Sequence, residues 1–137
     1  MSMRQIKFRA KTINEGEWVY SMTISHGTVD RKRNCLFFEV QEDKWKGVIP
    51  ETLGQFTGLA DRNGKEIYEG DILSNDLSKS FCEVVFRNGC FMLRLNDGGE
   101  DFYDFFDILS PLEDDITQAK YHEVIGNIYD NPELIHQ

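Results

Sequence analysis

The sequence has few cysteines and none of the spacings that cysteine-based sites require. Only Cys35, Cys82 and Cys90 occur among its 137 residues, and no two of them form a CxxC pair. An odd number of widely separated cysteines does not supply a disulfide framework, and structural zinc requires four Cys or His ligands in paired spacing. We therefore expect reduced thiols, buried as small apolar side chains in a cytoplasmic protein, and no metal site.

Long apolar runs are also missing. Residues 1–9 alternate charged and apolar side chains and contain no continuous apolar segment of the kind a signal peptide needs. Nowhere does the chain approach the roughly 20 apolar residues of a membrane-spanning helix. The sequence thus predicts neither secretion nor a membrane partner, and it favours a cytoplasmic location.

Motifs that identify a reaction are absent from the sequence. There is no GxGxxG and no P-loop, and the Gly98-Gly99 pair is explained more simply as a turn. None of His26, His122 and His136 lies in a local pattern that links it to a nucleophilic cysteine. Paired carboxylates such as Asp104 and Asp107 fall in so dense an acidic run that coincidence explains them. We therefore predict no catalytic residues and no cofactor, and a binding protein rather than an enzyme.

Basic charge is scarce and unevenly distributed. The chain has 15 Lys and Arg against 24 Asp and Glu, a net charge of −9, which disfavours nucleic acid as a partner. Residues 1–50 carry a net +3 and residues 51–137 a net −12, and no Lys or Arg occurs from Leu95 to Ala119. The acidic segment is either a solvated face or a surface that binds a basic partner or mimics a polyanion.

The basic residues of the first part form two groups. Within residues 6–11 the apolar side chains alternate with cations, which predicts a strand with one buried and one cationic face. Together with a later basic run and the aromatic Trp18 and Tyr20, they make a candidate basic patch of Lys7, Arg9, Lys11, Arg31, Lys32 and Arg33. The patch either stacks single-stranded nucleic acid or pairs with the acidic segment, within one chain or between subunits.

A period of two dominates the whole sequence. Return strands are expected at Trp18-Val19-Tyr20, continuing through Met22 and Ile24, and at residues 35–40. Asn88-Gly89 is the preferred centre of a type I′ hairpin turn. It predicts Phe86 opposite Phe91, Val84 opposite Leu93 and Glu83 opposite Arg94, with Cys82 and Cys90 on opposite faces. A second turn is expected at residues 61–65.

Helix is predicted only near the C-terminus. Residues 114–122 have room for one or two turns, Asn131 can cap a short helix that starts at Pro132, and residues 123–129 form a late strand between them. Many short strands with glycine turns predict an all-β fold with one or two short helices, in the form of an SH3-like or related small β-barrel. We expect a single β-rich domain over residues 1–137.

Three stretches carry a family resemblance. They are IKFRA at residues 6–10, TGLADRNGKEIYEGDI at residues 57–72 and EVIGNIYDNPEL at residues 123–134. In this order and near these spacings they resemble the YopX family of phage and prophage proteins, and the resemblance covers essentially the whole chain. It implies a mainly β fold and a phage or mobile-element setting inside a bacterial host cell, and it implies no activity.

The motifs supply the candidate binding residues, which are Thr57, Gly58, Asp61, Gly64, Tyr68, Glu69, Gly70, Asp71, Asn127 and Tyr129. Their simplest role is structural, since Gly70 suits an unusual backbone angle and Asp71 can accept backbone hydrogen bonds. A metal or acid–base site built from Asp61, Glu66, Glu69 and Asp71 is the disfavoured alternative, because no known loop spacing accompanies these carboxylates. The leading hypothesis is a non-enzymatic phage accessory protein that binds or assembles and forms a homo-oligomer. The alternative is an acidic inhibitor or nucleic-acid mimic that acts on a basic host or phage protein.

Overall fold

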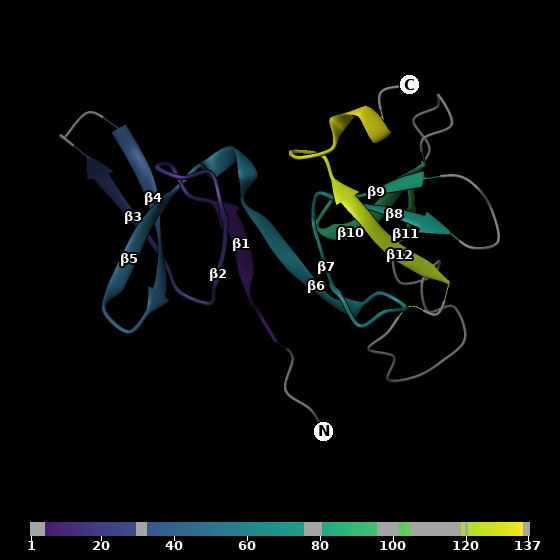
Figure 1. Ribbon diagram of the computed structural model, residues 1–137, viewed down its shortest axis with the longest axis horizontal. Coiled ribbons are helices and arrows are strands. Elements are labelled where there is room, and N and C mark those ends of the chain that lie inside the picture. Colours follow the sequence, from purple (N-terminus) through teal and green to yellow (C-terminus); the bar gives the residue numbers. More distant parts are fainter. Residues whose placement is uncertain are drawn as a thin grey trace. The chain divides into compact units, whose positions relative to one another are not determined.

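The computed structural model describes residues 5–29, 33–75, 81–95, 102–104, 119 and 121–135. The chain divides into two compact units, Met1–Phe56 and Thr57–Gln137, which are described one at a time. Figure 1 shows that both are built from β-strands. The described residues contain short 3₁₀ helices and no α-helix, so the all-β prediction is confirmed. The expectation of one domain over the whole chain stays a prediction.

Unit 1 contains two small antiparallel sheets. In one, β1 (Phe8–Lys11) lies between β2 (Trp18–Ser21) and the first residues of β6 (Gly54–Ala60). The other has the order β3 (Ile24–Val29), β4 (Arg33–Gln41) and β5 (Lys44–Val48). A 3₁₀ turn over Pro50–Thr52 connects β5 to β6.

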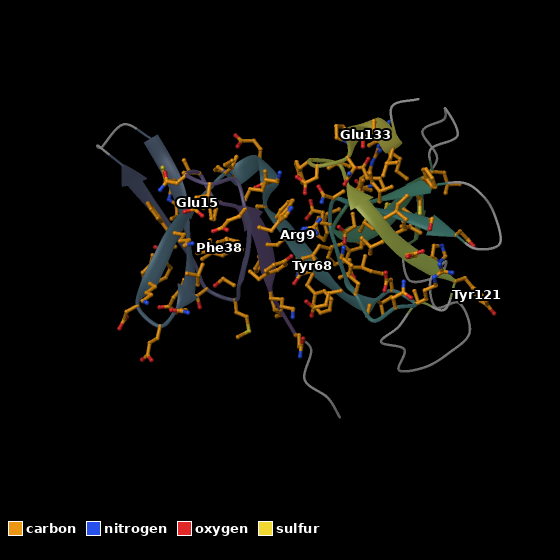
Figure 2. All side chains as sticks on the ribbon, viewed as in Figure 1. Arg9, Glu15, Phe38, Tyr68, Tyr121 and Glu133 are labelled. Carbon is orange, nitrogen blue, oxygen red and sulfur yellow. The ribbon has the colours of Figure 1, made fainter. Side chains whose placement is uncertain are left out.

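The core of unit 1 follows the predicted alternation in part. Ala10, Phe38 and Val48 are fully buried, and Phe8 packs against them (Figure 2 labels Phe38). Three details of the prediction are wrong. Ile6, predicted on the buried face, is 50% exposed and precedes β1. The return strand β2 ends at Ser21, so Met22 is 76% exposed between strands and Ile24 belongs to β3.

Unit 2 is a five-stranded antiparallel sheet with a β-hairpin before it. The end of β6 and β7 (Glu66–Tyr68) form the hairpin. The sheet has the order β11 (Phe102–Asp104), β10 (Cys90–Leu95), β9 (Phe81–Arg87), β8 (Asp71–Asn75), β12 (His122–Asn127). Its core contains Leu59, Ile67, Leu73, Val84, Leu93 and Ala119, all nearly or fully inaccessible to solvent.

The β9–β10 hairpin confirms the predicted register. Phe86 lies opposite Phe91, Val84 opposite Leu93 and Glu83 opposite Arg94. Asn88 and Gly89 have φ values of 55° and 80°, as a type I′ turn requires. The observed register is therefore the one that the Asn88-Gly89 turn predicts.

Several sequence-based expectations are corrected. The described strands form three open sheets, and none of these closes into the barrel we expected. We expected a helix over residues 114–122. Of these, the structure describes Ala119, Tyr121 and His122. None of the three is in a helix, and His122 begins β12. The late strand ends at Asn127, not at Tyr129, and Pro132 does start a 3₁₀ turn, Pro132–Leu134.

Within the described part of the chain, no helix has the length and apolar character to cross a bilayer.

Candidate functional site

Asp61 is the centre of a hydrogen-bond network in unit 2. Its side chain is 1% exposed, and its Oδ1 accepts hydrogen bonds from the backbone N–H groups of Asn63 and Lys65, both at 2.9 Å. Its Oδ2 accepts a third, from the N–H of Val124 on β12, also at 2.9 Å. One buried carboxylate thus holds the 61–65 turn and fastens it to a distant strand.

The outer side of the same turn also contacts β12. The Arg62 Nη2 lies 2.7 Å from the Glu123 Oε2, and the Asn63 amide Nδ2 donates to the Glu123 Oε1 at 3.2 Å. The backbone N–H of Arg62 donates to the carbonyl of His122 at 3.0 Å. Side chains from two separate motifs of the sequence therefore meet here.

Tyr68, Gly70 and Asp71 shape the turn between β7 and β8. The Asp71 Oδ2 accepts a hydrogen bond from the backbone N–H of Tyr68 at 2.8 Å, and both residues are buried. Gly70 has a φ of 94°, which suits a residue without Cβ. Its N–H donates to the Val84 carbonyl and its own carbonyl accepts from Ile128 N–H. The turn is thereby joined to two other segments, with Glu69 half-buried within it.

Thr57 and the nearby glycines have comparable local roles. The Thr57 hydroxyl donates to the carbonyl of Ile67 at 2.8 Å and accepts from the N–H of Leu59 at 3.2 Å, which fixes the β6–β7 pair. Gly58 and Gly64 both have positive φ, 92° and 85°. These two positions are exposed and provide backbone shape without a side-chain contact.

Asn127 organises the C-terminal turn in the same way. Its Oδ1 accepts from the backbone N–H groups of Tyr129 and Asp130, at 3.0 and 2.9 Å. Its own N–H donates to the Oδ1 of Asn131 at 3.3 Å. A Cβ on Gly126 would lie 2.4 Å from that oxygen, so only glycine fits at this position.

The motif residues of unit 2 thus have a common function, which is to hold backbone turns by hydrogen bonds. Among the described residues, no group of three or more His, Cys, Asp or Glu side chains is placed to hold a metal ion. Both carboxylate oxygens of Asp61, and the Oδ2 of Asp71, accept hydrogen bonds from backbone N–H groups. The geometry therefore supports structural roles for these carboxylates.

The predicted basic patch is covered by aromatic rings of unit 1. The Arg9 guanidinium lies 4.5 Å from the centre of the Trp18 ring, and the Lys11 ammonium lies 5.5 Å from the same ring. Lys7 lies over Phe56 at 5.1 Å. Arg9 is only 5% exposed, so the predicted cationic face is not an open surface at its centre. Arg31 and Lys32 lie outside the described residues, as does the side chain of Arg33.

The three cysteines differ in exposure. Cys82 is buried, Cys35 is half-buried and Cys90 is exposed, so the expected burial is wrong for Cys90; all three are free thiols. Burial raises the pKa of the Cys82 thiol to about 12. Cys82 therefore stays protonated at neutral pH, consistent with the predicted role as a small apolar residue.

Strand β3 presents an open sheet edge in unit 1. It pairs with β4 on one side, and no other described strand pairs with it. The N–H of Glu39 donates to the carbonyl of Thr23, just before β3. Because orientation alternates along an antiparallel ladder, Ser25 and Gly27 direct their backbone groups to β4, while Ile24, His26 and Thr28 direct theirs outward. Sequence analysis did not detect this edge, since strand order is not a local property.

A second feature missed by sequence analysis is a hollow beside Trp45. It lies between the β1–β2 turn and β5, and Asn14, Glu15, Trp45 and Gly47 are among its lining residues. The sequence signal that could have indicated it is Lys44-Trp45-Lys46, because strand alternation places the indole on the opposite face from the two lysine side chains.

These observations define the class of protein as an all-β protein whose sequence motifs build turns. The chain belongs to the YopX family, since the family model for YopX protein matches residues 7–136. The resemblance noted from the three motifs is thereby confirmed.

Two solved structures extend this relationship to the fold. The chain is similar to protein EF1440 from Enterococcus faecalis, with 26% identity, a TM-score of 0.56, and coverage of 98% of this chain and 100% of that one. It also shares its fold with protein yopX from Bacillus subtilis, at 20% identity and a TM-score of 0.54, with 98% of each chain covered. No curated protein matches the sequence.

Proposed function

We propose that the protein is a non-enzymatic assembly module of a phage or prophage, and that it associates with a second copy of itself through strand β3. One observation carries the proposal, namely the open edge of β3. The phage setting rests on the family, and the homo-oligomer was expected from the sequence.

The composition of β3 suits this role. Its sequence, ISHGTV, contains no Lys, Arg, Asp, Glu or Pro, which are the residues that natural proteins place on edge strands to prevent pairing. An uncharged edge with outward N–H and C=O groups is a template for another strand. Its own sheet has only three strands, so a second copy would extend it to twice that number.

A two-fold axis through the edge gives one natural register. Residues that direct their backbone groups outward pair with each other, so His26 faces His26 of the second copy and Ile24 faces Thr28 of the second copy. The interface is then the same surface on both chains, as closed dimers require.

Sedimentation of single-residue variants tests the proposal. The wild-type protein is expected to sediment as a dimer that dissociates on dilution. His26→Lys places two ammonium groups opposite each other, and His26→Pro removes an outward N–H without breaking the ladder to β4. Both variants should be monomeric.

His26→Thr is the matched control, because it keeps a neutral residue with high strand propensity and should remain dimeric. Circular dichroism checks that each variant is folded. A monomeric wild-type protein at high concentration would overturn the proposal, and so would a folded His26→Lys variant that still forms a dimer of unchanged stability.

A further inference from the structure

The two tryptophans of unit 1 differ in their surroundings. Trp18 is half-buried, with Arg9 and Lys11 against its ring. Trp45 is 43% exposed, and within the described part of the chain no cation or aromatic ring lies over it. Trp18 thus contacts two cations, whereas the face of the Trp45 ring is open.

The open indole borders a hollow of about 150 Å³, which is lined by Thr12, Asn14, Glu15, Trp45, Lys46 and Gly47. That volume is about five times the roughly 30 Å³ that one water occupies in the liquid. It is well below the roughly 300–1,000 Å³ of pockets that bind drug-sized molecules. The hollow therefore has room for the end of one side chain and not for a nucleotide.

Two apolar side chains lie over Gly47, two positions along β5 from Trp45. A Cβ on Gly47 would lie 3.3 Å from the Ile13 Cδ1 and 3.6 Å from the Phe37 Cε1, so these side chains occupy the space over that glycine. Phe37 and Gly47 are direct neighbours across the β4–β5 ladder. The indole thus stands next to a preformed apolar surface, which lowers the entropic cost of binding.

The charges around the hollow leave an excess of carboxylate. The Lys46 ammonium lies 3.2 Å from the Glu17 Oε1, so these two charges largely compensate each other. This hydrogen bond from Lys46 is the main reason that the pKa of Glu17 is lowered, and Glu17 therefore stays ionised at neutral pH. Glu15 lines the hollow and its side chain hydrogen-bonds with that of Glu17, but it has no cationic partner among the residues the structure describes (Figure 2 labels Glu15).

A further carboxylate adjoins the indole. Glu39 lies directly opposite Trp45 on β4, and its Oε2 accepts a hydrogen bond from the exposed backbone N–H of Asp43 at 3.2 Å. An aromatic face flanked by Glu15 and Glu39 attracts a planar cation, because the ring face and both carboxylates are negative.

We propose that this hollow binds an arginine side chain of a partner protein. The guanidinium stacks on the Trp45 ring and its N–H groups donate to the Glu15 carboxylate, while the Asn14 amide oxygen is available as a further acceptor. Arginine fits better than lysine, since its planar fork both stacks and forms paired hydrogen bonds with a carboxylate.

Nuclear magnetic resonance of the indole N–H groups tests this proposal directly. The chain has two tryptophans, and the Trp45 signal is the one missing from Trp45→Leu. Titration with the blocked peptide acetyl-Gly-Arg-Gly-amide is expected to shift the Trp45 signal saturably, while the Trp18 signal serves as an internal control. The same peptide with citrulline, a neutral isostere of arginine, should produce no saturable shift.

Variants around the hollow give opposite predictions. Glu15→Gln should weaken binding of the arginine peptide about two- to fivefold, and Lys46→Met should strengthen it by a similar factor, as expected for exposed charge pairs. Equal shifts with the citrulline peptide, a response of Trp18 instead of Trp45, or no response at all would each overturn the proposal. A Lys46→Met variant that binds more weakly would do the same.

The site is independent of the proposed dimer. β3 and β5 flank β4 on opposite sides, so the hollow beside β5 is separate from the β3 edge. Titration of the His26→Lys variant distinguishes the two ideas. A monomer that still binds the arginine peptide supports this site whatever the outcome for self-association.

Discussion

The carboxylate of Asp61 accepts a hydrogen bond from the backbone N–H of Val124 at 2.9 Å, across 63 positions of the sequence. With the two bonds that it accepts inside its own turn, it joins the central motif to the C-terminal motif. The central and C-terminal motifs of the sequence are therefore joined by one buried carboxylate.

Asp61→Asn should destabilise unit 2 by about 1–3 kcal/mol, because an amide places an N–H₂ group against at least one backbone donor in a buried site. Urea unfolding followed by far-ultraviolet circular dichroism measures the change. Asp43→Asn is the control, since Asp43 is exposed with a φ of 59°, which Asn also tolerates. Equal stability of Asp61→Asn and wild type would contradict the role assigned to Asp61.

Gly126→Ala should disrupt the C-terminal turn. The new Cβ would lie 2.4 Å from the Asn131 Oδ1 and 3.0 Å from the Asn131 Cβ, so Asn131 must move and its bond to the Asn127 N–H is lost. We expect a cost of about 1–3 kcal/mol, typical of overpacking.

Gly64→Ala provides the comparison for Gly126→Ala. Its φ is 85° but the space around its Cβ is open, so only backbone strain of about 1 kcal/mol applies. In the double variant with Asn131→Ala, the cost of Gly126→Ala should fall markedly. Simple additivity of the two changes would show that Asn131 is not the obstacle.

Cys82 should make the protein less stable at alkaline pH. The unfolded thiol has an ordinary pKa of 9.0, and the pKa of the folded thiol is raised to about 12 by burial. Between these values the unfolded state binds fewer protons, so the free energy of unfolding falls as pH rises, by about 1.4 kcal/mol per pH unit.

Cys82→Ala tests the alkaline effect. This variant is less stable at pH 7 because of its smaller side chain, but its stability should depend less on pH above 9. In the wild type at pH 8, iodoacetamide should modify the exposed Cys90 well before Cys82. Rapid labelling of Cys82 in the folded protein would contradict its burial.

Trp18→Leu should cost more stability than Trp45→Leu. The Trp18 ring contacts two cations, and loss of each contact costs about 0.5–2 kcal/mol depending on its desolvation. Trp45 is exposed and makes no such contact with the described residues. Thermal unfolding of the two variants compares them, and a larger effect of Trp45→Leu would reverse our ranking.

The parts of the fold that local chemistry determines could be predicted from the sequence. Asn88-Gly89 has few alternatives to a tight hairpin turn, and it determined the pairing of Phe86 with Phe91 and its neighbours. Phe8 and Ala10 alternate with cations, and these two residues do face the core of unit 1. In each case the signal lies within about ten residues.

Long-range relationships could not be predicted in this way. The bond between Asp61 and Val124 depends on which strands meet, and Arg9 is buried because of packing that no alternation of residues encodes. Closure of a sheet into a barrel is also a long-range property. The all-β prediction was therefore confirmed, whereas the described strands do not form the predicted barrel. The exposure of Trp45 could not be predicted either, because it depends on which parts of the chain pack over its ring.

Both tryptophans lie in unit 1, within Met1–Phe56, and unit 2 contains none. Tryptophan fluorescence therefore reports the melting of the N-terminal unit alone, whereas circular dichroism reports both. If the two signals change at the same urea concentration, the units unfold cooperatively as one domain. Two separated transitions would instead make the chain a pair of independently folding halves, distinguished without any added label.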